Sequence, residues 1–153
     1  MTPDGLRVGD RLPDVTLFDA SGEVPLRSLV GAGPLVLYFY PRDETPVCTA
    51  QACAFRDAYE DFLAAGAQVV GVSSDDAASH ARFASRHDLP FRLLEDRGGG
   101  ARAALGIPRR LGLLPGRVTY VIDREGVVRY TFDSAFRGRE HVRRALAEVR
   151  KLS

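Results

Sequence analysis

Hydrophobic residues concentrate in short runs that are separated by longer segments of mixed polarity. Residues 34–40, "PLVLYFY", and residues 67–74, "AQVVGVSS", are mainly apolar, which is typical of strands buried on both faces of a sheet. Residues 15–26, "VTLFDASGEVPL", place Ser21 and Gly22 between two strand-like halves. This pattern predicts an N-terminal hairpin with its turn at those two residues.

The segment between the two apolar runs carries the signals of a helix. Thr45 can cap a helix over residues 46–65, Pro46 suits its first turn, and Gly66 can end it. We therefore expect this helix to connect two neighbouring parallel strands by a right-handed crossover.

Two further helices are predicted downstream. Asp75 or Asp76 can cap a helix over residues 77–87, "AASHARFASRH". Residues 138–152 predict a final amphipathic helix, and its apolar side carries Val142, Leu146 and Val149.

The remaining apolar segments complete the predicted fold. Residues 91–94 predict a short strand, and residues 97–116 a weak helix followed by a loop rich in Gly and Pro. Residues 117–123 and 126–132 predict two strands around a turn. Strands that alternate with helices, followed by a hairpin and a closing helix, predict an α/β sandwich with a central mixed sheet and helices on both faces. The 153 residues suffice for one domain with its own core.

Composition narrows the function classes only slightly. Hydrophobic residues make up 45% of the chain, charged residues 27%, and the net charge is +1, so nothing indicates nucleic acid or a membrane as a partner. The chain starts without an apolar h-region, and its longest apolar run is too short for a membrane span. We therefore expect a cytoplasmic protein. Cysteines there are usually reduced, which favours redox or metal chemistry over a structural disulfide.

The two cysteines of the chain lie together in "YPRDETPVCTAQACAFRD". Cys48 is expected in the first turn of a helix, just past the carboxyl end of a central strand, where open α/β sheets bind ligands. Unpaired N–H groups and the helix dipole favour a thiolate there, and the thiolate is the nucleophile. Thr45 can direct its hydroxyl at the same place, and Pro41 can shield it from water. The alternative is a buried cysteine that acts as a small hydrophobe.

The separation of Cys48 and Cys53 indicates a cycle between two conformations. Two Cα atoms five residues apart on a helix are about 8.6 Å apart, whereas a disulfide needs roughly 4.4–6.8 Å. The two cysteines can therefore bond only if the first helical turns unwind. The alternative is that Cys53 is only a packed core residue.

A metal site is the rival use of the two thiols. Two thiols without a third ligand make a poor zinc site. The histidines, His80, His87 and His141, lie on other predicted helices without mutual ligand spacing, and we expect them at the surface.

The stretch "YFYPRDETPVCTAQACAFRD" resembles the active-site segment of the peroxiredoxins, and in particular of their Q-type, or bacterioferritin-comigratory-protein, subfamily. The Pro-x-x-x-Thr-x-x-Cys pattern of that family falls on Pro41, Thr45 and Cys48, and the Q-type resolving cysteine falls on Cys53. The late arginine of the family falls on Arg117 in "RVTYVID". "VGDRLPDVTLFDASGEVPL", "GVSSD" and "YVIDREGVVR" extend the likeness over nearly the whole chain.

The resemblance implies a single thioredoxin-like domain over residues 1–153, a three-layer sandwich that acts as a thiol peroxidase on hydrogen peroxide and organic hydroperoxides. Cys48 would become a sulfenic acid while Thr45 and Arg117 polarise the peroxide, and Cys53 would then resolve it as a disulfide. Thioredoxin or a related dithiol protein would be the reductant. No metal, haem or flavin cofactor is implied, and we expect a monomer or a weak homodimer.

Two features of the sequence depart from the family pattern. Val47 stands where the family usually has Gly, and the segment 106–117 is shorter than in many relatives.

Two other functions could use a cysteine pair. A redox sensor or chaperone-like protein could use the same cysteine pair as a switch, but it would turn over peroxide slowly or not at all. A thioredoxin-like disulfide reductase would instead have Cys-x-x-Cys.

Overall fold

The computed structural model describes residues 5–107, 109–110 and 114–152. These residues form a seven-stranded sheet with the order β2-β1-β5-β4-β3-β8-β9 and a separate pair, β6-β7. The strands are β1 (Thr16–Asp19), β2 (Gly22–Pro25), β3 (Leu35–Phe39), β4 (Gln68–Ser73), β5 (Arg92–Glu95), β6 (Arg109–Arg110), β7 (Leu114–Pro115), β8 (Val118–Ile122) and β9 (Val128–Asp133). The pairs β3-β4 and β4-β5 are parallel and the others antiparallel, so the sheet is mixed, as predicted.

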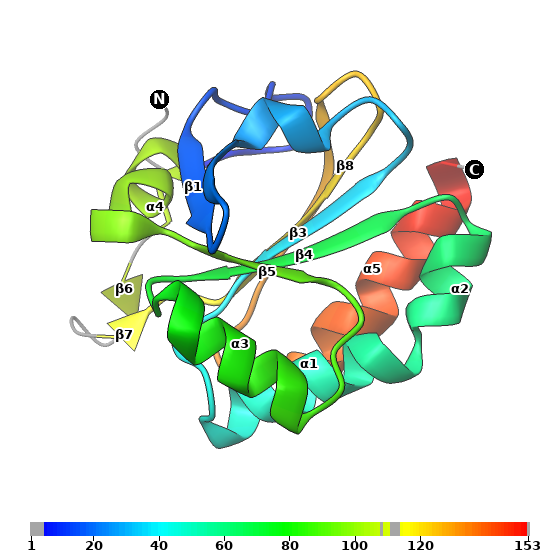
Figure 1. Ribbon diagram of the computed structural model, residues 1–153. Helices are drawn as coiled ribbons and strands as arrows, with labels where there is room; N and C mark the ends of the chain where they lie inside the picture. Colours follow the sequence, from blue (N-terminus) through cyan, green and yellow to red (C-terminus); the bar gives the residue numbers. More distant parts are fainter. Residues whose placement is uncertain (1–4, 108, 111–113, 153) are drawn as a thin grey trace.

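Helices cover both faces of the sheet (Figure 1). They are α1 (Pro46–Asp57), α2 (Tyr59–Ala64), α3 (Ala77–Arg86), α4 (Gly100–Leu105) and α5 (Gly138–Leu152), with short 3₁₀ turns at η1 (Leu26–Leu29) and η2 (Arg97–Gly99). Four of them, α1, α2, α3 and α5, pack on one face, and α4 packs with the N-terminal hairpin and η1 on the other. The predicted three-layer α/β sandwich, with its N-terminal hairpin, is confirmed.

Strand β3 runs through the middle of this sandwich. Its alternate residues Leu35, Leu37 and Phe39 belong to the core on the α4 side, whereas Val36 and Tyr38 belong to the core beneath α1 and α5. All five side chains are buried. A strand with two buried faces needs an unbroken apolar run, and this explains "PLVLYFY".

The single helix predicted over residues 46–65 is two helices. Ala58, with φ −95° and ψ 4°, separates α1 from α2. Thr45 is the N-cap residue of α1 and Pro46 occupies the first turn, both as predicted, but the Thr45 side chain makes no capping hydrogen bond. The hydroxyl of Thr45 instead donates a hydrogen bond to the carbonyl of Arg42 at 2.9 Å.

The later elements follow the prediction with small shifts. Asp76 caps α3, where its Oδ1 accepts a hydrogen bond from the N–H of Ser79 at 2.9 Å. Helix α5 has the predicted bounds. The expected loop before β8 contains the pair β6-β7, and part of the shortened segment 106–117 lies outside the described residues. None of the helices in the described part of the chain is long and apolar enough to cross a membrane.

Candidate active site

Cys48 occupies the third position of α1, immediately beyond the end of the central strand β3. The chain leaves β3 at Phe39, turns through residues 40–45, and enters α1 at Pro46. The side chain of Cys48 is buried, with 1% of the residue exposed. The sulfur therefore lies in an apolar setting near the positive end of a helix dipole, where the first-turn N–H groups have no intrahelical partner.

Arg117 contacts the sulfur directly. Its Nη2 donates to Cys48 Sγ at 3.2 Å, its Nη1 donates to Gln51 Oε1, and its Nε donates to the carbonyl of Ala135 at 2.9 Å. Arg117 precedes β8, which pairs with β3 so that Val118 lies opposite Phe39. The arginine is only 3% exposed, and its guanidinium is fixed by three acceptors, two in α1 and one in the segment after β9. A fixed positive charge at this sulfur stabilises negative charge on it.

Gln51 is part of this site, although it was not among the residues predicted from the sequence. It lies three residues after Cys48, and side chains at that spacing share a helix face. The residue is fully buried, and its Nε2 has no hydrogen-bond partner among the described residues. The three-residue spacing from Cys48 is the sequence signal that could have identified Gln51. Its partner, Arg117, could not be identified in this way, because it lies far along the chain, just before β8.

The start of α5 supports the first two turns of α1. A Cβ atom at Gly138 would lie 3.0 Å from Gln51 Cβ and 3.1 Å from the carbonyl oxygen of Val47. A residue with a Cβ atom would therefore push Gln51 or the carbonyl of Val47 away by a few tenths of an ångström. This contact fixes the part of α1 that carries Cys48 and Gln51.

Pro41 and Thr45 lie on the loop that leads into α1, and both are partly exposed. The single hydroxyl proton of Thr45 is donated to Arg42, so this hydroxyl does not donate to the sulfur in this conformation. Of the predicted site residues, the structure joins Cys48 and Arg117 by a direct contact. Pro41 and Thr45 belong to the flanking loop.

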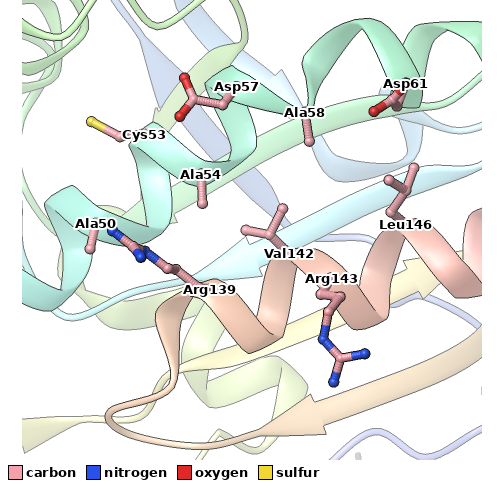
Figure 2. Close-up of a pocket in the computed structure, with 10 residues that line it drawn as sticks. All are labelled: Ala50, Cys53, Ala54, Asp57, Ala58, Asp61, Arg139, Val142, Arg143 and Leu146. Atoms are coloured by element: carbon pink, nitrogen blue, oxygen red, sulfur yellow. The ribbon is translucent and has the colours of Figure 1, made fainter.

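Cys53 lies farther along α1, at a groove of about 460 Å³ between α1 and α5 (Figure 2). The groove is lined by Ala50, Cys53, Ala54, Asp57, Ala58, Asp61, Arg139, Val142, Arg143 and Leu146. Cys53 is partly buried, both cysteines are free, and α1 continues through both. This arrangement is the wound, unbonded one that the spacing predicted.

The expectation that the histidines lie at the surface is wrong for His80 and His141. Both are buried, with 4% and 0% of the residue exposed, because each finds polar partners in the interior. His141 Nε2 donates to the carbonyl of Ser134 at 2.8 Å, and its Nδ1 accepts from the Thr119 hydroxyl at 2.8 Å. Burial lowers the pKa of His141 to about 4. Within the described residues, no group of three His, Cys, Asp or Glu side chains could hold a metal ion.

Comparison with known proteins agrees with this geometry. The AhpC/TSA family matches residues 8–131. The chain is 50% identical over 141 residues to chloroplastic peroxiredoxin Q of Triticum aestivum, covering 92% of this chain and 65% of that protein. It is 51% identical over 135 residues to chloroplastic peroxiredoxin Q of Arabidopsis thaliana, covering 88% of this chain and 62% of that protein. The chain thus spans about two thirds of the length of these relatives.

Solved structures show the same fold over almost the whole chain. Peroxidoxin BcpB from Mycobacterium tuberculosis has a TM-score of 0.88 and 36% identity, covering 97% of this chain and 99% of that chain. Peroxiredoxin Q of Xanthomonas campestris has a TM-score of 0.81 and 30% identity, with 98% of each chain covered.

The expectation of a cytoplasmic protein is wrong, because similar curated relatives, among them those of Triticum aestivum and Arabidopsis thaliana, are chloroplastic proteins. That expectation was based on a missing h-region, which marks secretory signals only. Transit peptides are amphipathic and rich in Arg and Ser, so a search for an h-region does not detect them.

Proposed function

The chain belongs to the AhpC/TSA family as a peroxiredoxin of the Q type, and on this basis we propose that it reduces hydroperoxides through Cys48. One observation supports this proposal above all others. The guanidinium of Arg117 donates to Cys48 Sγ at 3.2 Å in a buried site at the start of a helix. A structural cysteine has no need of a buried cation, whereas a thiolate nucleophile does.

In the first step, the Cys48 thiolate attacks one oxygen of the hydroperoxide, and the O–O bond breaks. The distal oxygen stays on sulfur as a sulfenic acid, and the rest of the peroxide leaves as water or an alcohol after taking up a proton. Negative charge moves from sulfur to the departing oxygen. Arg117 donates to the sulfur and stabilises the thiolate from which the attack starts.

In this proposal, Thr45 and Pro41 act on the peroxide from the loop that leads into α1, residues 41–45, which we call the entry loop. The hydroxyl of Thr45 rotates away from the carbonyl of Arg42 to donate to the bound peroxide, at the cost of one neutral hydrogen bond. Pro41 restricts the loop and excludes water. The structurally similar bacterioferritin comigratory protein of Xanthomonas campestris has alkyl peroxide reduction activity, and this favours organic hydroperoxides among the substrates here.

In the second step, the thiol of Cys53 attacks the sulfenic sulfur of Cys48, a disulfide forms, and water leaves. The first turns of α1 must unwind for this step, because an intact helix holds the two Cα atoms about 8.6 Å apart. A dithiol protein of the thioredoxin kind then returns two electrons and two protons, and α1 rewinds. We propose that residues 1–153 carry out this cycle as one domain.

Steady-state consumption of hydrogen peroxide and of a bulky organic hydroperoxide, with and without thioredoxin, tests the proposal. Wild-type protein should turn over repeatedly with the reductant, and the Cys48→Ser variant should show no turnover. Single-turnover oxidation without reductant-dependent cycling would instead indicate a redox sensor. Full activity of Cys48→Ser would exclude the proposed mechanism.

A further inference from the structure

A buried hydrogen-bonded pair, Asp43 and His80, lies beside the active site. Among the described contacts, neither residue hydrogen-bonds to the sulfur of Cys48 or Cys53. Asp43, on the loop between β3 and α1, is 5% exposed and accepts three hydrogen bonds. The Tyr40 hydroxyl donates at 2.6 Å, the Ser79 hydroxyl at 2.8 Å and His80 Nδ1 at 2.7 Å. Ser79 and His80 belong to α3, so these contacts tie the entry loop of α1 to another helix.

Contacts on both sides of the His80 ring link the entry loop to β5. Its Nδ1 lies 2.7 Å from Asp43 Oδ2, and its Nε2 lies 3.1 Å from the carbonyl oxygen of Leu94 in β5. Burial opposes ionisation of Asp43, but hydrogen bonds from His80 and Tyr40 outweigh it, and the pKa of Asp43 lies below its ordinary value. His80 therefore joins the entry loop, α3 and β5 at one buried point.

Further contacts hold the entry loop to residues at both ends of α3. The N–H of Asp43 donates to Asp75 Oδ2 at 2.7 Å. Glu44, the next residue, adopts φ 66°, a left-handed conformation that is unfavourable for a non-glycine residue. Such a conformation persists only where the surroundings hold it. Glu44 also pairs with Arg86 at 3.6 Å and His87 at 3.4 Å, both at the end of α3.

We propose that the hydrogen-bonded Asp43–His80 pair is a positioning device that keeps the first turns of α1 wound, and so sets the balance between the reduced state and the disulfide state. The entry loop, residues 41–45, is continuous with α1, so the contacts that hold Asp43 to α3 also restrain the start of α1. Loss of the pair favours the unwound state and with it the Cys48–Cys53 disulfide. This inference rests on the proposed disulfide cycle, but it concerns residues that touch neither the peroxide nor the sulfurs.

The Asp43→Asn variant tests this inference, because asparagine keeps the volume of the side chain and removes its charge. Its matched control is Asp123→Asn. Asp123 is also a buried carboxylate, which accepts from Val127, Glu125 and Arg129 in the β8-β9 turn, far from α1. Ser79→Ala removes a single donor to Asp43 and serves as a milder second variant if Asp43→Asn does not fold.

The first measurement is the redox equilibrium of the Cys48–Cys53 pair against a dithiol buffer. Asp43→Asn should shift this equilibrium about tenfold toward the disulfide, which corresponds to a potential about 30 mV more negative. Asp123→Asn should leave the potential unchanged, because Glu125, Val127 and Arg129, the partners of Asp123, belong neither to α1 nor to its entry loop. An equal shift in both variants would overturn the inference, since loss of global stability alone would then explain it.

The second measurement is amide exchange across residues 41–52 of the reduced proteins. Exchange should accelerate about tenfold in Asp43→Asn and remain at the wild-type rate in Asp123→Asn. Absence of a disulfide in wild-type protein after peroxide treatment would refute the proposed function, and the exchange rates would still decide whether the pair holds α1. Unchanged exchange in Asp43→Asn and Ser79→Ala overturns the inference.

Discussion

The Nη2 atom of Arg117 lies 3.2 Å from the sulfur of Cys48, although the two residues are 69 positions apart in the chain. The antiparallel pairing of β3 with β8 produces this contact. Phe39, at the end of β3, lies opposite Val118, so the residue before β8 lies beside the chain that leads into α1. The site therefore depends on strand register, because a slip of one residue would turn Arg117 to the other face of the sheet.

Arg117→Lys should slow the formation of sulfenic acid at least about tenfold. A lysine ammonium keeps the charge, but it cannot donate in fixed directions to Cys48, Gln51 and Ala135 together. Charge-assisted hydrogen bonds are worth roughly 1.5–3 kcal/mol, which corresponds to tenfold or more in rate. Stopped-flow measurement of the reaction with peroxide checks this value. An unchanged rate constant would remove Arg117 from the chemical step.

Gly138→Ala should destabilise the protein by roughly 1–3 kcal/mol, because the added methyl group presses on Gln51 and on the carbonyl of Val47. Gly100→Ala is the matched control. Gly100 has αR backbone angles, and a Cβ there meets nothing within 4 Å, so this change should be neutral or slightly stabilising. Urea unfolding of both variants measures the difference. Equal urea midpoints for the two variants would show that α1 and α5 can move apart to accommodate the methyl group without loss of stability.

Local patterns in the sequence predicted most of the fold. The strands β3, β4 and β8 have two buried faces and read as apolar runs, and the closing helix has a clear apolar side. The break at Ala58 was missed because alanine is a good helix former and nothing local marks a stop there.

The contacts of the site depended on tertiary structure that local patterns do not encode. Cys48 could be selected from its position, and Arg117 only through the family resemblance, because strand register brings them together. His80 and His141 were placed at the surface because their partners belong to other segments of the chain. Thr45 was expected to cap α1, but its hydroxyl donates to the carbonyl of Arg42 and makes no capping hydrogen bond.

The stability of the protein should fall as the pH is lowered from about 6.5 to about 4, with His141 as a main cause. Burial lowers the pKa of His141 from 6.5 to about 4, so in this window the unfolded chain binds a proton that the folded protein does not. The loss is at most about 3 kcal/mol at the acid end, and the contribution is constant above pH 6.5. Urea unfolding across this range should show a smaller acid slope for His141→Gln. Identical slopes would assign the effect to other groups.

The last prediction concerns Cys53 and the unwinding of α1 together. Cys53→Ser should react once with peroxide and then stall as the Cys48 sulfenic acid, which overoxidises more readily because no thiol captures it. In the wild-type protein, Cys53 and Cys48 lie on one continuous helix and are unbonded. Formation of their disulfide must therefore disrupt the first turns of α1.

Two measurements separate the parts of this prediction. Non-reducing mass spectrometry after peroxide treatment should find the two cysteine peptides linked within one chain, and a peptide linked between two chains would refute the intramolecular route.

Amide exchange of the oxidised protein should be faster over residues 45–56 than in the reduced protein, because the helical hydrogen bonds of that stretch are lost. Protection equal to that of the reduced protein would mean that the disulfide forms without unwinding. The geometry of an intact helix argues against that outcome, since its Cα separation of about 8.6 Å exceeds the roughly 4.4–6.8 Å that a disulfide spans.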